Sequence, residues 1–144
     1  DHPLVIAARR RRNEFPSLES FVERLRGKPP YSECEDAAVW GYATLGTCKT
    51  PSGVSLTCSG DTEARIFGTG TATDFSTLSS VSTPTVVARG ELVGTGNELP
   101  PAMAEPIASN LGDGKLVPME GLTHFGPMEH GVRVGQAILT HLLA

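Results

Sequence analysis

Two short apolar runs near the end of the sequence constrain the fold of this chain more than any other feature. TVVARG, at 85–90, is an apolar run closed by glycine, which is typical of a buried parallel strand. KLVPME, at 115–120, is a second strand candidate, and Pro118 within it cannot donate a hydrogen bond to a neighbouring strand. The pattern therefore predicts a buried strand beside an outer edge strand.

A helix is expected after each of these strands. Met103, Ile107 and Leu111 recur at helical spacing, which predicts a helix over about 101–111. A second amphipathic helix is expected over 127–143, where proline is suited to the first turn. The order strand, helix, strand, helix is typical of the edge of a doubly wound sheet. We therefore expect an α/β fold with two parallel strands and flanking helices over 84–144.

Residues 1–83 follow a different pattern, with helices, loops and little sheet. Apolar residues at three- and four-residue spacing predict a helix over 17–26, with Ser17 as its N-cap. Asp61 is expected to head a helical turn over 61–67. The remaining expectations are helices over 3–13 and 35–44, a loop over 46–53, a short strand over 54–58 and a Gly-, Ser- and Thr-rich connector over 68–83.

The composition is that of a soluble globular protein. Of the 144 residues 39% are hydrophobic, and the formal net charge is −4, which indicates neither a disordered chain nor a nucleic-acid-binding surface. No apolar run approaches the roughly 20 residues that a membrane-spanning helix needs. The one basic run, Arg9 to Arg12, is either the solvated face of a helix or a patch that attracts an anionic ligand.

The cysteines favour a reducing, cytoplasmic setting. Their number is odd and no two are spaced as C-x-x-C, with a Cys48–Cys58 bridge as the alternative. The third cysteine is Cys34.

Neither a metal nor a cofactor is expected. GTGNEL, at 94–99, lacks the third glycine of a dinucleotide-binding fingerprint. Three histidines show no metal-ligand spacing with a carboxylate or cysteine partner: His2, His130 and His141.

His124 is the strongest candidate for chemistry. It lies in GLTHFGP, at 121–127, the loop after the second strand, and open α/β sheets hold their ligands at the C-terminal ends of the strands. Imidazole titrates near neutral pH and is suited to general-base work. Glu91 follows the neighbouring strand, so its carboxylate could fix the tautomer of His124. The alternative is that His124 is a polar residue of a surface loop.

The same residues resemble the α/β-hydrolase family. STPTVVARGEL looks like that family's penultimate strand, and KLVPMEGLTHFGPMEHGVRVGQAILTHLL looks like its last strand, histidine loop and closing helix. The resemblance covers 84–144 and extends more loosely over 1–83, which is similar to the helical cap that such enzymes insert before the last two strands. It implies that His124 occupies the position of the catalytic base.

Two departures from the family pattern concern the rest of the triad. The family's nucleophile stands on a G-x-S-x-G elbow, and no such pentapeptide occurs in this chain. The family's usual acid position, three residues after the strand-ending glycine, holds Val93. Glu91 and Glu98 are the substitutes in the same loop, and the alternative is an acid on a strand upstream of Asp1.

The resemblance thus implies the C-terminal half of an α/β-hydrolase that cleaves an ester or a related small hydrophobic substrate. Its partner would be the upstream half of the same hydrolase or, alternatively, a second copy of the chain, and neither a nucleic acid nor a membrane is expected. A lid formed by residues 1–70 would select the substrate. The candidate lining residues are Phe21, Trp40 and Tyr42. The alternative from another class is a non-catalytic binding module that kept the hydrolase scaffold.

Overall fold

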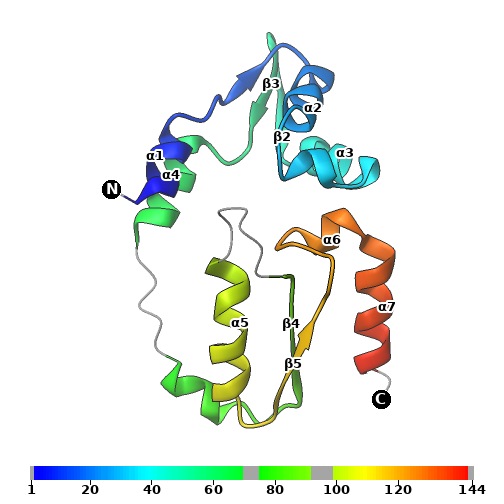
Figure 1. Cartoon of the computed structure of the whole chain (residues 1–144). Coiled ribbons are helices and arrows are strands. Elements are labelled where there is room, and N and C mark those ends of the chain that lie inside the picture. Colours follow the sequence, from blue (N-terminus) through cyan, green and yellow to red (C-terminus); the bar gives the residue numbers. More distant parts are fainter. Residues whose placement is uncertain (1, 70–74, 92–98, 143–144) are drawn as a thin grey trace. The chain divides into compact units, whose positions relative to one another are not determined.

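The chain forms two compact units, Asp1–Ala72 and Thr73–Ala144 (Figure 1). The structure is a computed structural model that describes residues 2–69, 75–91 and 99–142. Residues 75–83, which the sequence pattern grouped with the helical part, belong to the second unit. In the described ranges, no helix has both the length and the apolar character needed to cross a membrane.

The first unit is mostly helical and contains a small antiparallel sheet. Its strands lie in the order β1-β3-β2. Its elements are α1 (Pro3–Arg9), β1 (Glu14–Phe15), α2 (Leu18–Arg26), η1 (Tyr31–Glu33), α3 (Asp36–Leu45), β2 (Thr47–Thr50), β3 (Gly53–Leu56) and α4 (Gly60–Gly68).

Three helix boundaries are set either by a capping side chain or by the pairing of the next segment with the sheet. Ser17 caps α2 as predicted, because its side chain accepts a hydrogen bond from the backbone N–H of Ser20. The cap of α4 is Ser59 and not the predicted Asp61, since the Ser59 hydroxyl accepts from the Thr62 N–H at 3.2 Å. α1 ends at Arg9, earlier than predicted, because the chain after it joins the sheet as β1.

The predicted loop over 46–53 is instead half of a β-hairpin. β2 and β3 pair antiparallel from Thr47↔Leu56 to Thr50↔Gly53. Gly53 has φ +140°, and a Cβ there would lie 2.1 Å from the Phe15 carbonyl oxygen, so this turn requires glycine. Polar residues fill β2, which explains why the apolar pattern gave no strand signal there.

The core of the first unit joins its helices to the short strands. Val5 and Ala8 of α1 pack with Ala64 of α4 in one buried cluster. The rings of Phe15 and Phe21 lie 4.5 Å apart between centroids, and both side chains are buried. This unit therefore has an apolar interior of its own.

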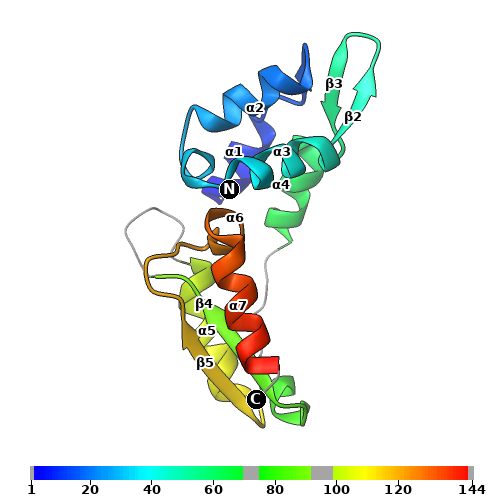
Figure 2. The ribbon, with the colours of Figure 1, turned by 90° about the vertical axis from the view of Figure 1, so that its right-hand side faces the viewer.

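The second unit contains the predicted α/β arrangement. β4 and β5 pair parallel in register from Thr85↔Gly114 to Arg89↔Pro118. Figures 1 and 2 show α5 and α7 on opposite faces of this pair. The elements are η2 (Ser76–Ser80), β4 (Thr85–Arg89), α5 (Leu99–Asn110), β5 (Gly114–Pro118), α6 (Gly126–Glu129) and α7 (Gly131–Leu142).

The helix predicted over 127–143 is broken in two. The backbone of His130, with φ −154° and ψ 67°, leaves the helical region between α6 and α7. The side chain of Glu129, at the end of α6, is bound to Thr123 in the preceding loop. The short helix α6 is therefore tied to the histidine loop, and the chain starts a new helix after it.

Among the described residues, the second unit has fewer buried hydrophobic side chains than the first. Among its described residues, the buried hydrophobic side chains are Ala104, Ala108 and Leu122. Hydrophobic side chains remain exposed on α7, among them Val132 at 66% and Leu142 at 75%. A sheet of two strands with this much uncovered apolar surface resembles the edge of a larger structure.

Candidate active site

The C-terminal ends of β4 and β5 form one edge, where the predicted site residues lie. Arg89 and Pro118 are register partners at these ends. The N–H of Met119 donates to the Arg89 carbonyl at 2.7 Å, which continues the pairing one step beyond the strands. The two loops that follow therefore leave the sheet side by side, at the edge where open α/β sheets place their ligands.

Gly90 lets the two loops approach closely. A Cβ at this position would lie 2.2 Å from the carbonyl oxygen of Thr123, so no side chain fits. The next residue, Glu91, donates its N–H to the Leu122 carbonyl at 2.7 Å. Leu122 is only 4% exposed and anchors the histidine loop in the unit.

The carboxylate of Glu91 also binds the histidine loop. Its Oε1 accepts a hydrogen bond from the N–H of Gly121 at 2.6 Å. Gly121 has φ +73°, a left-handed conformation that favours glycine. Glu91 thus holds the loop through both its backbone and its side chain, at Leu122 and Gly121, two and three residues before His124.

A second carboxylate, from Glu129, holds the loop at the residue before His124. Its Oε2 accepts from the N–H of Thr123 at 2.8 Å, and its Oε1 accepts from the Thr123 hydroxyl. The Thr123 hydroxyl oxygen accepts in turn from the N–H of Phe125 at 3.1 Å. Glu129 was not among the site residues predicted from the sequence, because its position inside a predicted surface helix gave no signal. Thr123 carried a recognisable turn signal, because a threonine hydroxyl can accept from the backbone N–H two residues later.

His124 is exposed at the tip of this braced loop. Its ring meets the ring of Phe125 edge to face, with 5.5 Å between centroids and 74° between planes. Among the described residues, no hydrogen bond joins its imidazole to a partner, the Glu91 carboxylate included. The structure brings His124 and Glu91 to the same edge without joining their side chains. The alternative positions Val93 and Glu98 lie outside the described residues.

The remaining titratable residues do not gather into a metal site in the described parts of the chain. His2 caps α1, where its Nδ1 accepts from the N–H of Leu4 at 3.3 Å. The three cysteines form no disulfide, so the alternative Cys48–Cys58 bridge is absent.

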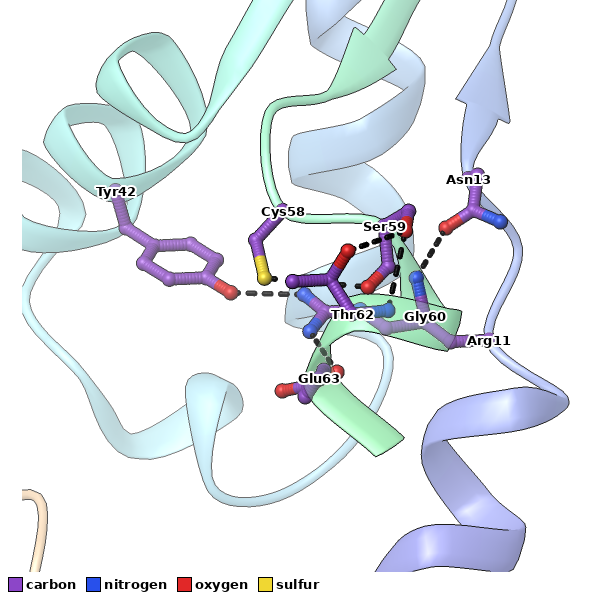
Figure 3. A network of polar contacts seen from close by, with 8 residues as sticks. All are labelled: Arg11, Asn13, Tyr42, Cys58, Ser59, Gly60, Thr62 and Glu63. Atoms are coloured by element: carbon purple, nitrogen blue, oxygen red, sulfur yellow. Dashed lines mark hydrogen bonds and ion pairs between the residues drawn. The ribbon is translucent and has the colours of Figure 1, made fainter. Parts of the chain in front are cut away.

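The first unit contains a separate polar network around Arg11 (Figure 3). Its guanidinium donates to the Tyr42 hydroxyl oxygen at 2.8 Å and to Glu63 Oε2 at 2.8 Å. Burial works to lower the pKa of Arg11, but the hydrogen bonds to Tyr42 and Glu63 outweigh burial and raise that pKa above its ordinary value. Arg11 is thus a fixed positive charge that links the end of α1 to α3 and α4.

The three proposed lining residues have different surroundings. Phe21 is 2% exposed and belongs to the core, while Tyr42 takes part in the Arg11 network. Trp40 is exposed on the surface of α3.

Tyr31 contacts the Tyr42 ring, and burial, followed by the hydrogen bond with Tyr42, raises the pKa of the Tyr31 hydroxyl.

Comparison with known proteins identifies the fold. No family model matches the sequence, and no curated protein matches it. Among solved structures, the chain is similar to the crystal structure of E-2-(acetamidomethylene)succinate hydrolase, an α/β-hydrolase, with a TM-score of 0.68 and 18% identity. The match covers 100% of this chain and 53% of that one, so the chain spans about half the length of that hydrolase. The predicted fold is confirmed: the chain has the fold of the C-terminal part of an α/β-hydrolase.

Proposed function

We propose that this chain forms the C-terminal part of an α/β-hydrolase and supplies its general base, His124. The observation that carries the proposal is the position of His124 on the loop after β5, braced against the end of β4. Three hydrogen bonds make that brace, from Met119 to Arg89, from Glu91 to Leu122 and from Gly121 to Glu91. The likeness to a solved hydrolase supports the same scaffold but, at 18% identity, reaches no further than the fold.

The proposed reaction cleaves an ester or a related bond of a small hydrophobic substrate. His124 takes the proton of a nucleophilic hydroxyl while that oxygen attacks the carbonyl carbon, and then gives the proton to the leaving alcohol. In the second half, His124 takes a proton from water as the water attacks the acyl-enzyme, and returns it to the nucleophile. The nucleophile comes from a segment outside these residues, because this sequence contains no G-x-S-x-G elbow.

Glu91 is the proposed orienting acid. Its carboxylate already bonds to Gly121 of the histidine loop at 2.6 Å. A carboxylate at this edge would hold the neutral imidazole in one tautomer and stabilise the imidazolium that forms during the reaction. Glu98, or an acid on another segment of the hydrolase, is the alternative.

The remainder of the hydrolase is the proposed partner of the second unit. In the described residues, β4 and β5 pair only with each other. A groove of about 230 Å³ between these strands and α7 is lined mainly by apolar residues. A neighbouring strand and its helices, from the other half of the fold or from a second copy of the chain, would cover this surface. The first unit would serve as the cap.

Labelling by a fluorophosphonate probe tests the proposal in the native protein that contains these residues. The probe reacts with an activated serine, so a hydrolase is labelled and a non-catalytic binding module is not. His124→Ala should slow labelling by about 10²-fold or more, since the base activates the nucleophile. His130→Gln, six residues away and exposed, is the matched control and should label at the normal rate. An unlabelled protein would favour the binding module.

A further inference from the structure

A cavity of about 540 Å³ lies within the first unit, bordered by α1, α2 and α4. Its volume is in the range of about 300–1,000 Å³ that is typical of small-molecule sites. All of its lining residues lie between Leu4 and Phe67, so it belongs to this unit alone. Neither His124 nor Glu91 contributes to it.

Part of the cavity wall is apolar. Phe15, Phe21 and Leu25 form part of its lining, and all three are buried. Two further lining side chains are unusually open for their type, since Leu4 is 43% exposed and Phe67 is 40% exposed. Contact with an apolar ligand would remove this surface from water, which is favourable.

The lining also carries an excess of positive charge. Five cationic side chains and one carboxylate line the cavity, which leaves four positive charges in excess. The chain as a whole has a formal charge of −4, so the local charge is opposite in sign to the total. Such a concentration of one sign in a concave site attracts ligands of the other sign. The cationic residues are Arg10, Arg11, Arg12, Arg24 and Lys28, and the carboxylate is Glu63.

Within the described ranges, most of these cations form no ion pair with a carboxylate. Glu63 pairs with Arg11 at 2.8 Å and is therefore already neutralised. Arg12 donates from Nε to the Glu14 carbonyl at 2.7 Å, and its guanidinium lies 5.3 Å from the centroid of the Phe15 ring. Over the described residues, Arg10, Arg24 and Lys28 show no ion pair. Their charges are available to a ligand.

We infer that this cavity binds a small organic anion, a carboxylate or phosphate that carries an apolar body. The anionic group would be neutralised by Arg10, Arg24 and Lys28, and the apolar body would cover the exposed side chains of Leu4 and Phe67. An inorganic anion without an apolar body would leave the apolar part of the wall in contact with water. A neutral hydrocarbon would leave the cations without a counter-charge. The inference does not rest on the proposed hydrolase function, because it concerns binding to the first unit.

Isothermal titration of the intact protein with three probes tests the ligand class. 4-Phenylbutyrate has both the charge and the apolar body, 4-phenylbutan-1-ol has the body alone, and inorganic phosphate has the charge alone. We expect phenylbutyrate to bind at least about ten-fold more tightly than either of the other two probes. It is the one probe that can form a charge pair with the cations and also bury an apolar body in a partly desolvated site. Equal affinities for all three would overturn the inference. A millimolar Kd would be detected at a phenylbutyrate concentration of about 10 mM. If no binding is detected at that concentration, the inference is also overturned.

A pair of double variants locates the site. Arg24→Gln with Lys28→Gln removes two cations from the cavity lining and should weaken phenylbutyrate binding by about ten-fold or more. Lys49→Gln with Arg65→Gln removes two exposed cations that do not line the cavity, and affinity should stay within about two-fold. All four residues are exposed, so circular dichroism should show the same folded state in both variants. Equal losses in the two variants would show a non-specific charge effect and overturn the assignment.

Discussion

Glu91 contacts the histidine loop in two ways, and the proposed mechanism gives its carboxylate a second function beside these contacts. Its N–H and its carboxylate fix the backbone at Leu122 and Gly121. The same carboxylate, as a negative charge, would stabilise an imidazolium at His124. The first function is positional and needs only a hydrogen-bond acceptor, whereas the second needs the charge.

Two substitutions of Glu91 separate the functions. Glu91→Gln keeps an oxygen for the Gly121 N–H but removes the charge, so we expect kcat to fall by about 10²-fold or more with little change in stability. Glu91→Ala also removes the acceptor and should lower both kcat and the free energy of unfolding, the latter by about 1–3 kcal/mol. Ester-hydrolysis kinetics and urea unfolding measure the two effects. Full activity in the glutamine variant would show that Glu91 only positions the loop and that Glu98 or another segment supplies the acid.

Elements with a strong apolar pattern could be predicted from the sequence, and those fixed by tertiary contacts could not. β4, β5, α2 and α5 have apolar periodicity or clear cap and stop residues, and the structure contains all four. β2 is polar and gave no strand signal, although it pairs with β3 along its whole length. The break between α6 and α7 accompanies the contact from Glu129 to Thr123, which no local pattern encodes.

The candidate site likewise has some features that could be predicted from the sequence and others that could not. The placement of Glu91 and His124 at neighbouring strand ends follows from strand order and could be predicted. The close approach of Gly90 to Thr123 joins residues from two separate loops and depends on the register of β4 against β5. Register is set by packing and pairing over the whole sheet, so a single sequence does not reveal such a contact.

Gly90→Ala tests whether that close approach holds the edge together. Its Cβ would lie 2.2 Å from the Thr123 carbonyl oxygen and would force the two loops apart. We expect a loss of about 1–3 kcal/mol in the free energy of unfolding, as for other overpacked sites. Gly41→Ala in α3 is the matched control, because a Cβ there meets nothing within 4 Å, and this helix variant should be neutral or more stable by up to about 1 kcal/mol. Equal stabilities of the two variants would contradict the described loop geometry.

Within the whole molecule, the two units differ in how many hydrophobic side chains each buries among its described residues. The first unit has buried residues on α1, α2, α3, β3 and α4. The second unit has few, and α7 has none among its described residues. We therefore propose that the second unit requires additional structure packed against it.

Size-exclusion chromatography with intact-mass analysis of the native material tests this requirement. We expect a species larger than the 15.2 kDa of these residues, either one longer chain, a cleaved chain that stays bound or a homodimer. The backbone amides of α7, and those on the edge of β4 that faces away from β5, should then be protected from hydrogen exchange. A monodisperse 15.2 kDa monomer that unfolds cooperatively would show that the second unit needs no partner.

The catalytic role of His124 is tested most directly by the kcat of ester hydrolysis by the native protein after His124→Ala. If His124 is the general base, kcat should fall by about 10³-fold or more, while the unfolding midpoint stays unchanged because the side chain is exposed. His130→Gln, in the same segment, should keep the activity of the unsubstituted protein. An alanine variant whose kcat stays within about ten-fold of the unsubstituted protein would contradict the assignment of His124 as the catalytic base.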